Sequence, residues 1–277
     1  MFVSKIRALL SNLLHRYFPS IFWKRKLNFF QSNYTEIELH LLPILCDINK
    51  TSIDIGGSIG CYTANMVKYS KDVVTFEPIP SNVNFLLELV KFTKIPVEIN
   101  EIALSDHSGV SQLQMVDVST GFSTIETQND LSKHSENVNS IDVKVEKLDS
   151  YKIKGIGFIK IDVEGHEYSV LKGSINTISD SLPNILVEIE ERHNKGSILK
   201  CVNILEKFGY EGFYILDKKI HPVSNFDILK YQNENYIKDF NFNDYNNRSL
   251  YINNFLFLPE KNRFEILNEL NNTLHLL

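Results

Sequence analysis

The chain has 277 residues, 43% of them hydrophobic, and a formal net charge of −5. This length can bury one large core with at most an appended segment, so one main domain is the simplest interpretation. The three cysteines, Cys46, Cys61 and Cys201, have neither paired nor metal-like spacing, so the sequence implies no disulfide framework and favours reduced thiols in a cytoplasmic protein.

Basic residues are concentrated at the start of the chain. Residues 1–30 contain six lysines and arginines and no acid, so the remainder carries a formal charge of −11. Because an acidic body repels phosphates, the charge distribution argues against nucleic acid as a substrate.

Residues 1–33 are predicted to form a leader that precedes a body domain at 34–277. Apolar residues recur in the leader at close to helical spacing with basic groups between them, which predicts one amphipathic helix. It is too charged for a transmembrane span, and it lacks the cleavage site of a secretory signal. Two interpretations stay open: the helix lies on the anionic inner face of a membrane, or it packs on the body or on a second copy in a homo-oligomer.

The body is predicted to begin with a helical segment at 34–46 and then to alternate between strands and helices. This alternation predicts an α/β fold with a mostly parallel sheet and helices on both faces. The predicted strands are 52–55, 73–76, 97–103, 157–161, 184–189, 213–216 and 255–258, and the predicted helices are 61–69, 81–91, 167–171 and 197–208.

An insertion at 109–150 separates the third and fourth predicted strands. It contains strand-like stretches at 111–118 and 141–147. Between them, residues 119–139 are polar and are predicted to form a mobile loop that closes over a ligand. Residues 225–254 are dense in Asn, Asp and Tyr and are predicted to be irregular.

A glycine turn follows the first predicted strand of the body. The strand ends at Asp54, and Gly56 and Gly60 then allow a tight turn that leaves backbone N–H groups free for a ligand. The next strand ends in Glu77, followed by Pro78, at the spacing where a carboxylate accepts both ribose hydroxyls of an adenosine moiety. Two structural alternatives are that Asp54 caps the following turn and that Glu77 is an exposed carboxylate at a strand end.

The order of these residues favours one adenosine cofactor. A dinucleotide fold uses G-x-G-x-x-G to hold a pyrophosphate, whereas here an acid lies two residues before the first glycine and the second glycine follows after three residues. Asp54 would repel a pyrophosphate but suits the ammonium and sulfonium groups of S-adenosylmethionine. The sequence therefore predicts S-adenosylmethionine as the cofactor.

A second polar cluster follows the strand predicted at 157–161. Because ligands bind at the carboxyl edge of an open α/β sheet, this cluster and the carboxylates after the next strand should face the same crevice as Asp54 and Glu77. Methyl transfer to a hydroxyl needs an aligned acceptor and a group that removes its proton. The candidates are Asp162, Glu164, His166, Glu167, Glu188 and His193.

Structural alternatives exist for these candidates too. Asp162 could cap the next helix, Glu164 and Glu167 could stabilise that helix through its dipole, and the two histidines could be exposed loop residues. The group would permit a divalent cation, but no spacing demands one, so no metal is predicted.

The motifs together resemble those of the FkbM-type S-adenosylmethionine-dependent methyltransferases. The resemblance covers about 54–191, with a final strand near 254–257. The motifs are Asp54-Ile55-Gly56-Gly57-Ser58-Ile59-Gly60-Cys61-Tyr62-Thr63, Phe76-Glu77-Pro78, Asn100-Glu101-Ile102-Ala103-Leu104-Ser105, Lys160-Ile161-Asp162-Val163-Glu164-Gly165-His166-Glu167 and Pro183-Asn184-Ile185-Leu186-Val187-Glu188-Ile189.

The resemblance implies a class I methyltransferase fold, Rossmann-like, with a seven-stranded sheet whose last strand is antiparallel. It also implies methylation of hydroxyls on sugars or related natural products, as in polysaccharide or glycan biosynthesis. Residues 34–277 would then be the methyltransferase domain. This family usually has Gly-Ala-Asn where the chain has Gly56-Gly57-Ser58, and serine replaces the amide contact with a hydroxyl.

Each candidate receives an expected role from the resemblance or from its chemistry. The expected catalytic residues are Asp162, His166 and Glu188. The expected cofactor-binding residues are Asp54, Gly56, Ser58, Gly60, Tyr62, Glu77, Pro78, Ala103, Leu104 and Asp162. The expected substrate-binding residues are Ser123, Thr124, Glu164 and His193.

Two other functions remain as alternatives. One is a nicotinamide-dependent oxidoreductase on a related sheet, which the glycine spacing disfavours. The other is a non-catalytic module that binds S-adenosylmethionine without turning it over. Saturable binding of NAD alone would favour the oxidoreductase over the methyltransferase. Release of S-adenosylhomocysteine with a sugar acceptor would exclude the non-catalytic module.

Overall fold

The structure is a computed structural model that describes residues 2–32, 36–116, 123–126, 128–129, 131, 138–238 and 251–277. Most of the loop predicted at 119–139 lies outside the described residues, as does the part of the tail at 239–250. Within the described chain, no helix is both long and apolar enough to serve as a membrane span.

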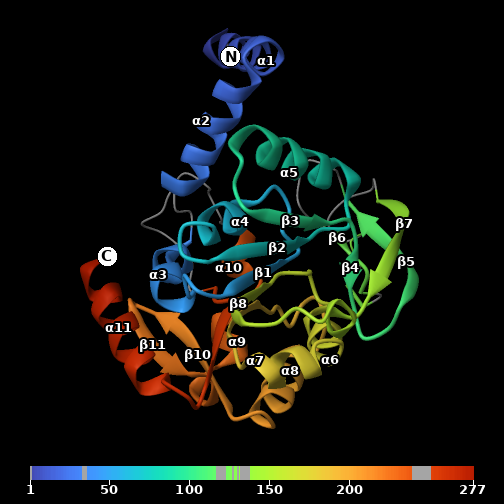
Figure 1. The fold of residues 1–277 in the computed structure, drawn as a ribbon. Helices are drawn as coiled ribbons and strands as arrows, with labels where there is room; N and C mark the ends of the chain where they lie inside the picture. The colour runs from blue at the N-terminus through green and yellow to red at the C-terminus, as the bar shows by residue number, and fades with distance from the viewer. Residues whose placement is uncertain are drawn as a thin grey trace.

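An eight-stranded sheet forms the centre of the described body, in the order β11-β10-β12-β9-β8-β1-β2-β3 (Figure 1). Neighbours from β3 to β9 pair in parallel, whereas β12 runs antiparallel to both β9 and β10. The strands are β1 (Thr51–Ile55), β2 (Asp72–Phe76), β3 (Val97–Asn100), β8 (Ile156–Ile161), β9 (Asn184–Glu188), β10 (Tyr210–Leu216), β11 (Lys219–Pro222) and β12 (Asn254–Pro259).

This topology confirms a mostly parallel α/β sheet with an antiparallel last strand. The predicted count of seven strands is one short for the described chain, because β11 pairs with β10 as an added hairpin at the sheet edge. The short stretch between β10 and β11 contains Asp217 and Lys218, both with positive φ, which is the turn geometry that closes such a hairpin.

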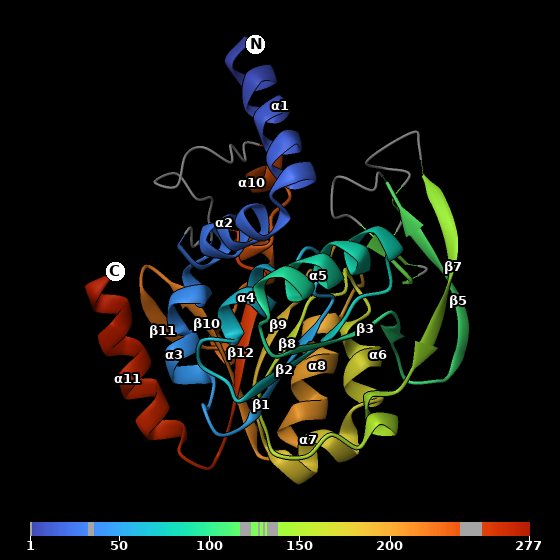
Figure 2. The ribbon, with the colours of Figure 1, turned by 45° about the horizontal axis from the view of Figure 1, so that its top comes forward.

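Helices cover both faces of this sheet (Figure 2). On one face, Ile159 and Ile161 of β8 pack with helices that include α6, α7 and α8. On the other, Phe158 of β8 packs with α3, α4 and α11, because successive strand residues point to opposite faces. The helices are α3 (Leu42–Leu45), α4 (Cys61–Met66), α5 (Pro80–Thr93), α6 (Glu167–Lys172), α7 (Ile175–Ser181), α8 (Ser197–Glu206), α9 (Ile228–Tyr231), α10 (Asn235–Lys238) and α11 (Arg263–Leu276).

A second, four-stranded sheet comes from the insertion, in the order β4-β7-β5-β6. Its strands are β4 (Ala103–Leu104), β5 (Gly109–Met115), β6 (Ser123–Thr124) and β7 (Asn139–Glu146). The single strand predicted at 97–103 is therefore wrong: the N–H of Ile102 donates to the Asn100 carbonyl in a turn, and the chain then leaves β3 for the second sheet.

The leader forms two helices, α1 (Phe2–Tyr17) and α2 (Pro19–Ser32), and not the one helix that was predicted. Pro19 explains the difference, because a proline fits the first position of a helix but interrupts the hydrogen bonds of a helix that would continue through it. Trp23 and Phe30 of α2 are buried with Ala64 of α4 and Leu89 of α5. α2 thus packs on the body, whereas α1 projects away from it (Figures 1 and 2).

Candidate active site

A cleft lies at the carboxyl ends of β1, β2 and β8 and is closed on one side by the second sheet. Its empty volume, including space open to solvent, is about 770 Å³. The cleft brings together residues from the glycine turn, from the end of β2, from the second sheet and from the turn after β8. The lining residues are Ile55, Gly56, Ser58, Phe76, Glu77, Pro78, Asn82, Ile102, Ala103, Leu104, Leu113, Ser123, Thr124, Ile125, Asp162, Val163, Glu164 and His166.

The glycine turn is built for close backbone approach. The N–H groups of Gly56 and Gly57 both donate to the Phe76 carbonyl, at 2.9 and 3.2 Å. Gly56 has a φ of +80°, and a Cβ added there would lie 1.8 Å from the carbonyl oxygen of Asp162. Glycine is therefore required at position 56 for both conformation and space.

Glu77 is buried at the end of β2, so the alternative of an exposed strand-end carboxylate is wrong. One of its carboxylate oxygens accepts from the N–H of Ser58 at 2.7 Å. The other accepts from the N–H of Ile79 at 2.9 Å and from Asn82 at 3.3 Å. Burial raises the pKa of Glu77, although these donors oppose the rise. Glu77 thus lines the cleft and also holds the glycine turn in place.

Three of the expected cofactor residues, Asp54, Gly60 and Tyr62, lie behind the turn, outside the cleft lining. Asp54 is buried and accepts from the Thr63 hydroxyl of α4 at 2.5 Å. Burial raises the pKa of Asp54 to about 6, and the Thr63 hydrogen bond opposes that rise. The Tyr62 hydroxyl donates to Glu36 at 2.6 Å, and its ring lies 5.1 Å from the Lys160 ammonium. Gly60, with a φ of +87°, is the N-cap residue of α4, the helix that contains Tyr62 and Thr63.

The second sheet contributes an apolar wall and two hydroxyl residues. Ala103 and Leu104 of β4 are buried and line the cleft together with Pro78. Ser123 and Thr124 form β6, a strand within the segment predicted to be a loop. The Thr124 hydroxyl donates to the Glu164 carbonyl at 2.7 Å, which ties the second sheet to the turn after β8.

Asp162 lies at the end of β8, with its N–H bonded to the Ile55 carbonyl at 2.9 Å. Its side chain is 35% exposed and lines the cleft. The buried Lys160 ammonium lies 3.7 Å from both Asp162 and Glu188. Burial alone would lower the pKa of Lys160, but these two carboxylates raise it above its usual value. Glu188 lies outside the cleft lining and accepts a hydrogen bond from Asn253 at 2.6 Å.

His166 lines the cleft and is largely buried, so the exposed-loop alternative is wrong for it. One ring nitrogen lies 2.9 Å from the Ser105 hydroxyl and the other lies 3.4 Å from a Glu126 carboxylate oxygen. Burial lowers the pKa of His166, and Glu126 opposes that effect. A largely neutral imidazole at the cleft wall can accept a proton near neutral pH.

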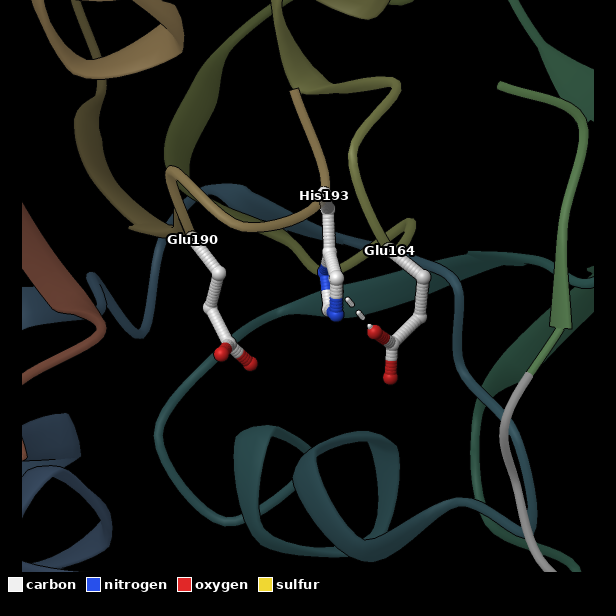
Figure 3. Close-up of side chains that lie close together, drawn as sticks. All are labelled: Glu164, Glu190 and His193. Carbon is white, nitrogen blue, oxygen red and sulfur yellow. Dashed lines mark ion pairs between the residues drawn. The ribbon is translucent and has the colours of Figure 1, made fainter. Parts of the chain in front are cut away.

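His193 is also buried, and its Nδ1 lies 3.2 Å from a carboxylate oxygen of Glu164 (Figure 3). Burial, then the negative charges of Asp162 and Glu190, raise the pKa of Glu164 well above its usual value. Arg192 binds both carboxylate oxygens of Glu190, at 2.5 and 3.1 Å, and holds the pKa of that buried carboxylate below its usual value.

Three polar residues of the site were not among the predicted site residues. Glu126 pairs with His166, Asn82 supports Glu77, and Glu190 lies beside His193. Glu190 carried a signal that could have been used, because it alternates with Glu188 at the end of a buried strand. Glu126 had no such signal, since it follows the polar segment at 119–125.

The cleft fits an adenosine cofactor with a methionine tail. The turn at Gly56 leaves no room for a side chain, Glu77 offers a buried carboxylate, and Ala103 and Leu104 present an apolar wall. These features together define the nucleotide site of an α/β enzyme.

Comparison with known proteins gives the class and the family. The profile of the methyltransferase FkbM domain matches residues 54–211. Since that span is more than half of the chain, the protein belongs to the FkbM methyltransferase family and is an S-adenosylmethionine-dependent methyltransferase. A protein from Beauveria bassiana named "Methyltransferase 1" is 25% identical over 178 residues, covering 57% of this chain and 71% of that protein.

Solved structures give weaker matches. The methyltransferase FkbM of Methylobacillus flagellatus has a TM-score of 0.49 and 15% identity, over 76% of this chain and 44% of that chain, so this chain spans less than half of its length. A chain from Streptococcus mutans in complex with SAH has a TM-score of 0.42 and 10% identity, over 82% of this chain and 98% of that one. The family assignment rests on the profile match, and it makes the nicotinamide-dependent oxidoreductase alternative wrong.

Proposed function

We propose that the protein transfers a methyl group to a hydroxyl of a sugar or related natural product, in polysaccharide or glycan biosynthesis. One observation carries the proposal: a single cleft is lined by Gly56, Glu77 and Asp162, which join a nucleotide site to a carboxylate at the reaction end. The hydroxyl as acceptor is supported by the carboxylates and histidine on that side, and the sugar class by the family resemblance.

The cofactor-binding roles divide between the cleft and the layer behind it. Gly56 and Ser58 would contact the methionine part, and Glu77 would accept from the ribose hydroxyls through its remaining lone pairs. Pro78, Ala103 and Leu104 would hold the adenine. Asp54, Gly60 and Tyr62 lie behind the turn, so we assign them to positioning the turn and α4.

When bound, S-adenosylmethionine supplies a methyl group on a positively charged sulfur and leaves as S-adenosylhomocysteine. Asp162, partly exposed at the cleft, would accept the proton of the acceptor hydroxyl. His166 is the second candidate for that proton, because its ring lines the same cleft. Glu188 would act indirectly by fixing Lys160, which in turn positions Asp162.

The acceptor would bind on the side of the cleft formed by β6 and the turn after β8. Ser123 and Thr124 of β6, with Glu164 of the turn, line this side, and His193 supports Glu164 from behind. Hydroxyls and carboxylates at this position suit a polyhydroxylated acceptor, because each sugar hydroxyl can donate and accept.

The test uses the purified full chain with S-adenosylhomocysteine, NAD and a panel of glycan acceptors. We expect saturable binding of S-adenosylhomocysteine, no binding of NAD, and the mass gain of one methyl group on at least one acceptor. Absence of S-adenosylhomocysteine binding would overturn the proposal. Binding with no transfer to any acceptor would favour the non-catalytic alternative.

We also propose a partner for the leader: the anionic inner face of a membrane. Leu10, Leu13 and Tyr17 of α1 share one helical face and are 59%, 44% and 62% exposed. The basic side chain of Arg16 is exposed on the same helix, with its guanidinium 5.5 Å from the Tyr17 ring. Exposed apolar and basic groups on one projecting helix suit the boundary between acyl chains and anionic headgroups.

Vesicle flotation tests this partner. We expect binding to vesicles with anionic lipid, weaker binding to neutral vesicles, and a larger loss from Leu13→Glu than from Asn12→Glu, which adds the same charge beside the apolar face. Equal loss from both variants would remove the apolar contact from the proposal. A dimer in light scattering that Leu13→Glu dissociates would instead assign the helix to a second copy of the chain.

A further inference from the structure

Three side chains converge behind the acceptor side of the cleft: Glu164, Glu190 and His193. One ligand atom from each, two carboxylate oxygens and an imidazole nitrogen, lies within 4.8 Å of the other two (Figure 3). Two ligand atoms bound to one divalent cation lie from about 3 Å apart, when they are neighbours, to at most about 4.6 Å apart, when they lie on opposite sides of the ion. The three atoms are therefore near enough for one ion to draw them together through small side-chain rotations.

The fold holds these side chains in place from different elements. Glu164 has a φ of +51°, and its carbonyl accepts from both Thr124 and Asn129, at 2.7 and 2.9 Å. The N–H of His193 donates to the Glu190 carbonyl at 3.0 Å, so these two residues form one turn. Backbone hydrogen bonds therefore fix the positions from which Glu164, Glu190 and His193 project.

Glu190 keeps a lone pair for a cation in spite of its neighbours. Arg192 donates to both of its oxygens, and the Tyr251 hydroxyl donates to the same oxygen as the Arg192 Nε. A carboxylate has about four acceptor positions, so the other oxygen retains one. Carboxylates that bind metals are commonly oriented by such outer hydrogen bonds.

Carboxyl groups outnumber basic groups around the three residues. Asp162, Glu164, Glu167 and Glu190 influence one another electrostatically, and the cations that act on them are Arg192 and Lys160. Glu167 is 1% exposed, and one of its oxygens has no hydrogen-bond partner among the described residues. A buried carboxyl oxygen without a hydrogen-bond partner is rare, so this region holds an unfilled polar contact.

We infer that Glu164, Glu190 and His193 bind a divalent cation such as Mn²⁺. Two oxygens and one imidazole nitrogen suit Mn²⁺ or Zn²⁺ better than Ca²⁺. This inference departs from the sequence-based expectation of no metal, because the fold joins residues that no linear spacing connects. It rests on the proposed function for its purpose: Glu164 lines the cleft, so the ion would hold the acceptor hydroxyl and make it more acidic.

The test is a Mn²⁺ titration of the full chain after chelator treatment and dialysis, followed by electron paramagnetic resonance of free Mn²⁺. We expect one ion per chain, and affinity reduced at least tenfold in both Glu164→Gln and His193→Gln. The control variants are Glu206→Gln and His275→Gln, which change an exposed carboxylate on α8 and an exposed histidine on α11 and should leave affinity within twofold.

Thermal melting of each variant shows whether it remains folded. If His193→Gln unfolds, Glu164→Gln alone decides, because it keeps the shape of the side chain. Affinity unchanged in Glu164→Gln, or no saturable Mn²⁺ binding, would overturn the inference and leave Glu164 and His193 as an ion pair. S-adenosylhomocysteine binding, measured on the same metal-free samples, separates this failure from failure of the proposed function, because the cofactor residues lie elsewhere in the cleft.

Discussion

The two sides of the cleft satisfy their polar groups in different ways. On the side of β1 and β2, backbone N–H groups meet Glu77 and the Phe76 carbonyl directly, so the turn is already bonded. On the side of β8 and β9, carboxylates and histidines meet one another, and one oxygen of Glu167 has no hydrogen-bond partner among the described residues. From this difference we propose a preformed cofactor side and an acceptor side that gains polar partners when a ligand binds.

The largest expected effect is on the reactive side. Asp162→Asn should lower the turnover rate by about a hundredfold to ten-thousandfold, because the amide cannot take up a proton. S-adenosylhomocysteine affinity should stay nearly unchanged, as measured by calorimetry. Asp142→Asn, an exposed position on β7, is the control. An unchanged rate in Asp162→Asn would make His166 the preferred base.

On the preformed side, the largest expected loss of stability comes from a change in the backbone of the glycine turn. Gly56→Ala should destabilise the protein by about 3 to 5 kcal/mol, since it adds strain at a positive φ to overlap with the Asp162 carbonyl. Urea unfolding gives the free energy. Gly155→Ala separates the two causes, because Gly155 has a φ of +64° with open space around it. Equal losses in both variants would show that space at position 56 does not matter.

Asp54 on the preformed side makes the stability of the protein depend on pH. Its pKa of about 6 in the folded protein exceeds the ordinary 3.8, so the folded state binds more protons than the unfolded state between those values. The Asp54 contribution to stability should fall as pH rises from about 4 to about 6, by on the order of 3 kcal/mol. The expected result for Asp54→Asn is a flatter stability curve in urea titrations over that window. Asp72→Asn, an exposed control on β2, should retain the wild-type curve. If Asp54→Asn also retained the wild-type curve, Asp54 would stay ionised in the folded protein across this pH range.

Glu77→Ala should have the smallest effect of the four. It should weaken S-adenosylhomocysteine binding by about 1 to 3 kcal/mol, because ribose hydroxyls and the Ser58 N–H lose a charged acceptor. Calorimetry measures the change, with Glu101→Ala at an exposed position as the control. If the affinity for S-adenosylhomocysteine is unchanged while the free energy of unfolding falls, Glu77 stabilises the glycine turn and does not bind the cofactor.

The same contrast explains what the sequence could predict. Gly56 and Glu77 end consecutive strands, so local rules for strands and turns predict that they meet. The acceptor side depends on contacts across long stretches of chain: Tyr251 reaches Glu190 from 61 residues away, and Thr124 reaches Glu164 from 40. No pattern of local periodicity encodes such contacts. The same limit hid the second sheet, in which β4 pairs with β7.

Motifs also did not predict which side chains reach the cleft, as Glu188 and Tyr62 show. Glu188 and Tyr62 belong to motifs that line up with the cleft, but their side chains meet Asn253, Lys160 and Glu36 behind it. Successive residues of a strand point to opposite faces, as for Glu188 at the end of β9, whereas Tyr62 lies on α4. Membership of a motif therefore does not fix which group reaches the ligand. The roles proposed for Glu188 and Tyr62 are therefore to position other residues of the site.

The packing of α2 on α5 provides an optical reporter. Trp23, the only tryptophan in the chain, is 2% exposed and meets the Phe85 ring edge-on at 4.7 Å. Indole emission therefore has one source, located at the joint between leader and body. A red shift on adding vesicles would mean that the leader leaves the body, whereas an unchanged spectrum with bound vesicles would mean that α1 binds lipid while α2 stays docked.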